Sequence, residues 1–209
     1  MDPDVVNRLN SNYFLATNSL QEILNNGILP NEELKEILKL KNKLIIAEFL
    51  EQYKHFSKQD LVDINIYINA NINNRNRLFV SDLIEFADDW NLELPYSKCI
   101  DLLTKFENNN TYVQLAMIDY LYNNLKIKYL DQIKCKLDDI LSNSECNQSV
   151  QIKSAFFLFR ITHNKKYLSD LIDLIVNGDD NKTLLKNILS KWYNMGDFFE
   201  YYTVLKSLL

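Results

Sequence analysis

Apolar residues recur every three or four positions along most of the chain, and this spacing places them on one face of an α-helix. The segment that begins at Thr111 shows the spacing most plainly, because its apolar residues follow the series i, i+3, i+4, i+7, i+8. They are Val113, Ala116, Met117, Tyr120 and Leu121. The same periodicity elsewhere predicts about ten or eleven helices, the last two over residues 184–192 and 198–209.

Residues that favour helix N-termini mark where the helices are expected to begin. They are Asp2 with Pro3, Pro30 with Asn31, Ser57 with Asp60, Ser81, Pro95, and Thr111 with Gln114. The first helix is predicted to run from Pro3 to a stop at Gly27. Apolar positions after Pro30 continue to Tyr53, so one long helix and two shorter ones both fit the sequence.

Residues 61–72 carry two overlapping patterns. Positions 64, 66, 68, 70 and 72 are apolar and alternate with other residues, which is typical of a strand. Leu61, Ile64, Ile68 and Ile72 also fall on one helical face. We favour a helix, because a single strand would have no sheet to join, and the strand is the alternative.

A sequence repeat relates residues 111–141 to residues 149–179. In the first half, Val113-Gln114-Leu115 matches Val150-Gln151-Ile152, and Tyr120-Leu121-Tyr122 matches Phe157-Leu158-Phe159, at an offset of 37. In the second half, Lys128-Tyr129-Leu130 matches Lys166-Tyr167-Leu168 at an offset of 38, and Ile133 and Leu137 match Leu171 and Ile175. A unit of this length, with helical periodicity in each half, is typical of stacked helical repeats.

Glycine is scarce, and its scarcity disfavours folds other than all-helical ones. Only Gly27, Gly178 and Gly196 occur among 209 residues, together with three prolines. Sheet-based folds use both residue types at tight turns, and doubly wound folds need glycine at phosphate loops. We therefore predict an all-α fold: an α-α superhelix (solenoid) of about five antiparallel helix pairs, forming a single domain over residues 1–209.

The two matched units resemble those of HEAT-like, or Armadillo-type, helical-repeat proteins, and looser helix pairs on either side extend the resemblance over most of the chain. The proline that HEAT units often carry in their first helix is missing here. Tetratricopeptide repeats, with a period of about 34 residues, fit less well because their Gly and Ala positions are absent.

The resemblance also points to a binding surface. In repeat proteins of this class the second helix of each pair usually lines the concave side, where ligands bind. Those helices would cover residues 126–142 and 165–177. Four aspartates there lie off the expected core stripes and form the predicted partner-binding surface: Asp131, Asp138, Asp170 and Asp173.

The sequence contains no recognisable catalytic, metal-binding or cofactor-binding motif. His55 and His163 belong to no HExxH motif, and Cys99, Cys135 and Cys146 show no CxxC spacing. The aspartate doublets Asp88-Asp89, Asp138-Asp139 and Asp179-Asp180 are poor acid–base pairs, because adjacent helical side chains point about 100° apart. We therefore expect buried, reduced thiols, no cofactor, no metal and no enzymatic activity.

The charge balance disfavours nucleic acid as a partner. The formal net charge is −5, the isoelectric point is about 5.1, and the four arginines include one local pair, Arg75 and Arg77. The sequence shows neither an N-terminal secretion signal nor an apolar run of about 18–20 residues, so we expect a cytoplasmic protein without membrane contact. Acidic rows on a binding surface would attract a basic protein.

These features favour a non-catalytic module that binds another protein. Small bacterial immunity proteins include HEAT-like members, and the resemblance implies that this chain binds and neutralises a basic toxin, such as a nuclease. The alternative is a scaffold or adaptor for a larger assembly. A HEAT-like DNA glycosylase is a further alternative, which the missing basic groove disfavours. The partner, the affinity and the oligomeric state are left open by the sequence.

Overall fold

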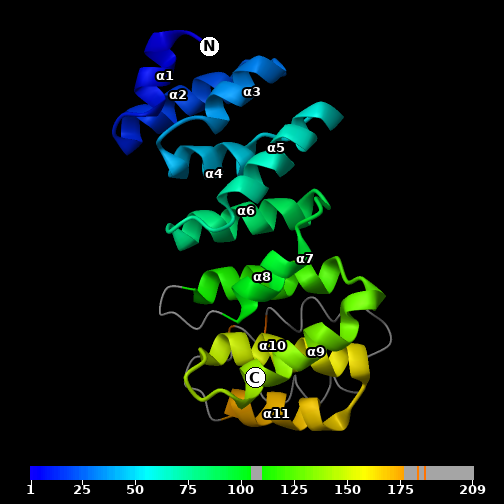
Figure 1. The fold of residues 1–209 in the computed structure, drawn as a ribbon. Helices are drawn as coiled ribbons and strands as arrows, with labels where there is room; N and C mark the ends of the chain where they lie inside the picture. The colour runs from blue at the N-terminus through cyan, green and yellow to red at the C-terminus, as the bar shows by residue number, and fades with distance from the viewer. Residues whose placement is uncertain (105–109, 177–182, 184–185, 187–209) are drawn as a thin grey trace. The chain divides into compact units, whose positions relative to one another are not determined.

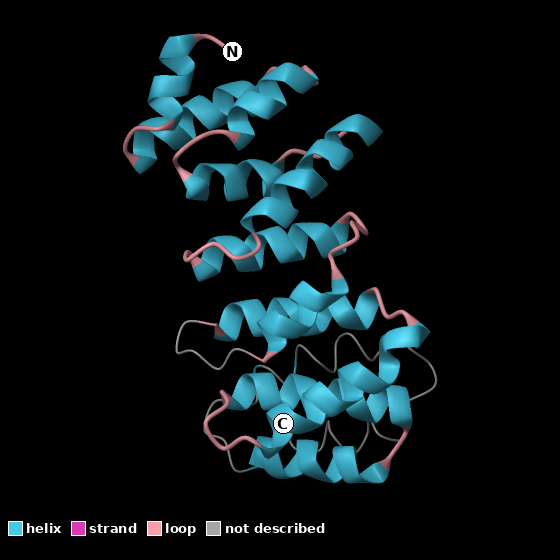
Figure 2. Ribbon diagram, viewed as in Figure 1, coloured by secondary structure: helices cyan, strands magenta, loops and turns pink. Residues whose placement is uncertain are grey.

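The computed structural model describes residues 1–104, 110–176, 183 and 186. Within this part of the chain it contains eleven α-helices, one short 3-10 helix and no strand (Figure 2). The all-α prediction is confirmed for these residues. The helices predicted at residues 184–192 and 198–209 fall almost entirely outside them.

The chain divides into two compact units. The first comprises Met1–Leu102 and Asp119–Asn124, and the described part of the second comprises residues 103–104, 110–118 and 125–176. The helices that lie wholly or mainly in the first unit are α1 (Pro3–Leu9), α2 (Tyr13–Asn25), α3 (Asn31–Leu38), α4 (Lys43–Gln52), α5 (Lys58–Asn71), α6 (Arg77–Asp89) and α7 (Tyr96–Leu103). Helix α8 (Thr111–Asn123) supplies its C-terminal end to the first unit and its remainder to the second. The second unit also holds η1 (Ile127–Tyr129), α9 (Leu130–Ser142), α10 (Gln148–Thr162) and α11 (Lys165–Val176).

Within the first unit the helices stack in two series (Figure 1). Helix α2 contacts α4 and α4 contacts α6, while α3 contacts α5. Within the second unit, α10 packs against both α9 and α11. The core is apolar in both units, with fully buried Phe49 and Phe79 in the first and Phe157 and Phe159 in the second.

Every even-numbered helix is preceded by an asparagine, a regularity that the sequence analysis missed. Asn12, Asn42, Asn76, Asn110 and Asn147 precede α2, α4, α6, α8 and α10. The side chains of Asn12, Asn76 and Asn147 accept first-turn backbone N–H bonds of 3.1, 3.2 and 2.8 Å, the usual role of an N-cap asparagine. Successive asparagines lie 30, 34, 34 and 37 residues apart, so the 37-residue repeat is the last interval of a longer series.

Equivalent positions after these asparagines are buried alike. The seventh residue after the asparagine is buried in all five helices: Ser19, Phe49, Leu83, Met117 and Ser154. The eighth is buried as well: Leu20, Leu50, Ile84, Ile118 and Ala155. Since one helical face supplies these positions, the repeat dictates which face of each even-numbered helix enters the core.

Several helix boundaries differ from the prediction because short polar side chains compete with the helix for backbone hydrogen bonds. The helix predicted from Pro3 to Gly27 is two helices, since α1 ends at Leu9 and Asn12 caps a new one. The stretch after Pro30 also forms two shorter helices, α3 and α4. The predicted cap Ser81 was wrong: it is buried inside α6, and Asn76 caps that helix instead.

Other local predictions hold. Residues 61–71 are helical, since α5 covers Lys58–Asn71 and Ile72 is its C-cap, and Ser57 and Asp60 form the expected capping box. Helix α7 starts directly after Pro95. Helix α8 begins at Thr111, but the Gln114 side chain donates to the Leu103 carbonyl (2.8 Å) rather than closing a capping box.

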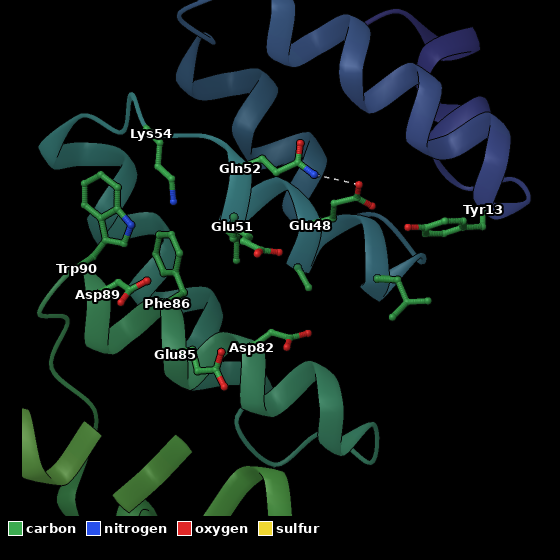
Figure 3. Close-up of a pocket in the computed structure, with 13 residues that line it drawn as sticks. Tyr13, Glu48, Glu51, Gln52, Lys54, Asp82, Glu85, Phe86, Asp89 and Trp90 are labelled. Atoms are coloured by element: carbon green, nitrogen blue, oxygen red, sulfur yellow. Dashed lines mark hydrogen bonds between the residues drawn. The ribbon is translucent and has the colours of Figure 1, made fainter. Parts of the chain in front are cut away.

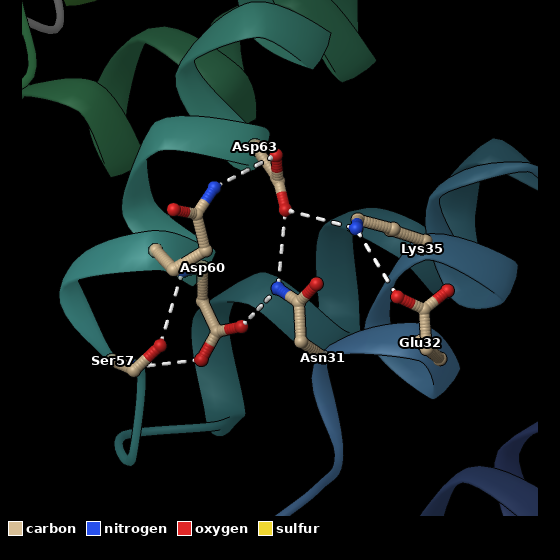
Figure 4. A network of polar contacts seen from close by, with 7 residues as sticks. Asn31, Glu32, Lys35, Ser57, Asp60 and Asp63 are labelled. Atoms are coloured by element: carbon tan, nitrogen blue, oxygen red, sulfur yellow. Dashed lines mark hydrogen bonds and ion pairs between the residues drawn. The ribbon is translucent and has the colours of Figure 1, made fainter.

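A partly buried polar network connects α3 with α5 (Figure 4). The Asn31 side-chain amide donates to Asp60 Oδ1 (2.7 Å) and to Asp63 Oδ2 (3.1 Å), and Lys35 Nζ lies 3.7 Å from Asp63 Oδ2. Burial opposes ionisation of Asp60, but hydrogen bonds from Asn31 and Ser57 outweigh it and lower the pKa of this carboxyl. The network therefore holds a charged carboxylate at the contact between two helices.

Candidate functional site

A groove runs along α4 and α6 in the first unit, with Tyr13 of α2 at one end (Figure 3). Its volume is about 650 Å³. Both walls are Asn-capped helices of the same series, which contact each other directly. The groove follows from the repeat, because each of these helices turns its core face inward and leaves the neighbouring polar face along the opening.

Acidic side chains dominate the groove. The wall formed by α4 carries Glu48 and Glu51, and the wall formed by α6 carries Asp82, Glu85 and Asp89. Lys54, at the end of the groove near Trp90, is the single basic residue among its described lining residues. Five carboxylates therefore share one ammonium group, and this imbalance creates a strongly negative local potential.

Most of these carboxylates have no partner within the part of the chain that the structure describes. Glu51, Asp82 and Asp89 form no hydrogen bond or ion pair there. Glu48 accepts a hydrogen bond from the Gln52 amide (3.0 Å), which in turn accepts one from Gln21 (2.8 Å). Desolvation by the groove walls raises the pKa of Asp82, and the negative charge of Glu51 raises it further.

Apolar side chains lie at both ends of the groove. At one end, the rings of Phe56, Phe86 and Trp90 pack together with centroids 5.3–5.9 Å apart. At the other end lies Tyr13, which is 61% exposed, and Leu44, which also lines the groove, is 52% exposed. Aromatic side chains beside unpaired charges are typical anchors of protein interfaces.

The described lining of the groove lacks three residue types that are common in catalytic sites. Its described lining residues include no Ser, Cys or His. Throughout the described part of the chain, no three His, Cys, Asp or Glu side chains come together as metal ligands. The carboxylates of the groove can attract cations and accept hydrogen bonds.

The four aspartates predicted from sequence lie in the second unit, and the structure brings three of them together. Asp138, Asp170 and Asp173 line a pocket of about 370 Å³ between α9 and α11, next to Lys166. Asp131 is exposed near the start of α9 and does not line this pocket. The Tyr167 hydroxyl donates to Asp138 Oδ2 (3.0 Å), so one carboxylate oxygen of Asp138 already has a hydrogen-bond partner within the fold.

The two described aspartate doublets behave as helix geometry requires. Asp88 accepts side-chain amide bonds from Asn123 (2.6 Å) and Asn124 (2.9 Å), whereas Asp89 lines the groove. In the other doublet, Asp138 faces Tyr167 and Asp139 pairs with Lys136 (3.0 Å). Neither doublet acts as a unit. Asp179-Asp180 lies outside the described residues.

The described cysteines are all free, as predicted, but their burial differs. Cys99 and Cys146 are buried, whereas Cys135 is exposed on α9. The prediction of buried thiols was therefore wrong for Cys135. Burial raises the pKa of Cys99 to about 12, which makes it a poor nucleophile at neutral pH.

The sequence analysis did not identify the groove residues, although a signal for them exists. Glu48 and Asp82 are each the sixth residue after their asparagine, and Glu51 and Glu85 are each the ninth. An alignment that superposes Asn42 on Asn76, 34 residues later, would have paired Glu48 with Asp82 and Glu51 with Glu85. The 37-residue repeat does not include these helices.

Comparisons with family models, with curated protein sequences and with solved structures yield no match to this chain. Within the described residues, no helix is long and apolar enough to cross a membrane.

Proposed function

We propose that this chain is a non-catalytic protein-binding module whose α4–α6 groove takes up a basic surface of its partner. The observation that carries the proposal is the set of five carboxylates, with one lysine, in a single groove of about 650 Å³. A partner with clustered lysines or arginines would supply the charges that Glu51, Asp82 and Asp89 lack within the described fold.

The proposal extends to neutralisation of that partner, as bacterial immunity proteins neutralise toxins. A stoichiometric inhibitor needs a tight surface and no chemistry of its own, and the groove combines aromatic anchors with unpaired charges. Basic nucleases suit such a surface, because the positive groove that binds nucleic acid also attracts carboxylates. The acidic groove argues against a DNA-binding role for this chain itself.

The test begins with capture of the tagged protein from its native source and identification of bound proteins by mass spectrometry. One small basic protein near 1:1 stoichiometry is the expected result. Capture of several large assembly components would favour a scaffold role over neutralisation. Failure to capture any protein would overturn the proposal. Co-expression of the captured protein, with and without this chain, then measures protection of the host cells.

A matched pair of variants locates the binding surface. The groove variant combines Glu51→Gln, Asp82→Asn, Glu85→Gln and Asp89→Asn, and the control combines Asp131→Asn, Asp138→Asn, Asp170→Asn and Asp173→Asn. Both remove four negative charges from the chain. We expect the groove variant to weaken partner binding at least a hundredfold and the control to weaken it less than threefold. The reverse order would move the binding surface to α9 and α11.

A further inference from the structure

The acidic residues of the groove are spaced along helices, and this spacing has consequences for what can fill it. On α6, Asp82, Glu85 and Asp89 stand at i, i+3 and i+7. A rise of 1.5 Å per residue places the second and third about 4.5 and 10.5 Å beyond the first along the axis. Glu48 and Glu51 repeat the i, i+3 spacing on the facing wall (Figure 3).

An α-helix aligned with the groove would present side chains at the same intervals. Lysines or arginines at i, i+3 or i+4, and i+7 lie on one helical face and advance by the same 1.5 Å per residue. In an extended segment, residues on the same side are about 6.6 Å apart. The second and third cations of such a segment would therefore not lie opposite the carboxylates, which are about 4.5 and 10.5 Å beyond the first. The charge spacing therefore favours a helix over a strand.

The apolar ends of the groove fit the same occupant. Phe86 and Trp90 lie at one end and Tyr13 lies at the other, and Leu44 also lines the groove. An amphipathic helix carries apolar side chains beside its charged face, so it can contact the rings while its cations meet the walls.

We infer that the groove binds an amphipathic α-helix of the partner that carries lysine or arginine at i, i+3 or i+4, and i+7, with a bulky apolar residue near Phe86 and Trp90. This inference rests on the proposed function, because it names the element of the basic partner that enters the groove. The α9–α11 pocket takes no part in it.

The test uses two alanine-rich synthetic peptides of identical composition. One places three lysines at i, i+3 and i+7 with a terminal leucine, and the other places them at i, i+2 and i+4. Circular dichroism verifies that both are equally helical, and isothermal titration calorimetry measures their affinity for the full chain. We expect the first peptide to bind at least tenfold more tightly, and we expect the groove variant to abolish this difference.

The alternative results separate the inference from the proposed function. Equal affinities of the two peptides would reject the inference that a helix occupies the groove. They would mean that the groove binds positive charge regardless of its spacing. If neither peptide binds but the captured partner binds through the groove, the helix is again rejected and the proposed function stands. Loss of both peptide and partner binding would reject both.

Discussion

The hydroxyl groups of Tyr53 and Tyr120 each bind the backbone N–H of a leucine that is followed by a proline. Tyr53 accepts a hydrogen bond from the Leu29 N–H (2.8 Å), and Tyr120 accepts one from the Leu94 N–H (2.8 Å). Tyr120 also donates to the Leu92 carbonyl (2.9 Å), and burial raises its pKa to about 12. Each hydroxyl thus satisfies a buried donor just before a helix begins.

The substitution Tyr53→Phe is expected to destabilise the first unit by about 1–3 kcal/mol, because it leaves the Leu29 N–H buried without an acceptor. Denaturant-induced unfolding measures the change. Tyr13→Phe is the matched control, since Tyr13 is 61% exposed, and it should change stability by less than about 0.5 kcal/mol. Equal unfolding midpoints for the two variants would contradict the role assigned to Tyr53.

Asp60 gives the fold a pH dependence of known sign. Its pKa is lowered in the folded state, so its ionised form stabilises the fold above the unfolded-state pKa, and this contribution is lost as pH falls through the lower, folded-state value. We therefore expect the stability advantage of the wild type over Asp60→Asn to shrink below about pH 4. Free energies of unfolding measured from pH 7 to pH 3 check this expectation, and a difference that does not vary with pH would contradict it.

At the scale of helices, Asp82 on α6 opposes folding when it is ionised. The raised pKa of Asp82 means that its ionised form is disfavoured in the folded state. Side chains that oppose folding and remain unpaired are typical of surfaces selected for binding rather than for stability. Asp82 is therefore not explained by a contribution to the stability of the fold.

The substitution Asp82→Asn is accordingly expected to leave stability at pH 7 unchanged or raise it by up to about 0.5 kcal/mol, since asparagine removes both the desolvation of the charge and the repulsion from Glu51, and solvent screens much of both. The gain should disappear below about pH 4, where the carboxyl of the wild type is protonated in both folded and unfolded chains. Thermal unfolding at both pH values provides the measurement. A loss above about 1 kcal/mol at pH 7 would assign Asp82 a structural role instead.

At the scale of the whole molecule, the distribution of charge determines which proteins would be attracted over a distance. The net charge is −5, and the groove concentrates negative charge where it has little internal compensation. A basic protein would therefore be attracted over distances of about a Debye length, which is about 10 Å at 0.1 M salt. Association should then be fast and sensitive to salt.

Raising the salt concentration from about 0.05 to 0.5 M is expected to slow association with the basic partner about tenfold or more, with a smaller effect on dissociation. Surface plasmon resonance separates the two rates. The groove variant should show a weaker salt dependence than the matched aspartate variant of α9 and α11. Association that is insensitive to salt would contradict electrostatic attraction as the basis of binding.

The sequence by itself determined the features that depend on neighbouring residues. The capping box of Ser57 and Asp60 and the helix start after Pro95 both follow from contacts within one turn. The scarcity of glycine likewise excluded most non-helical folds. Where several local caps compete, as around Asn12 and Asn76, the same reasoning misplaced the boundaries.

Only the tertiary structure decided which charged residues share a site. Glu51 and Asp82 are 31 residues apart, and each by itself resembles a solvated position on an amphipathic helix. Packing of α4 against α6 brings them into one groove. The predicted aspartates were separated for the same reason: Asp138, Asp170 and Asp173 line one pocket and Asp131 does not. Helical periodicity reveals the polar face of a helix, but the neighbouring helix determines what that face meets.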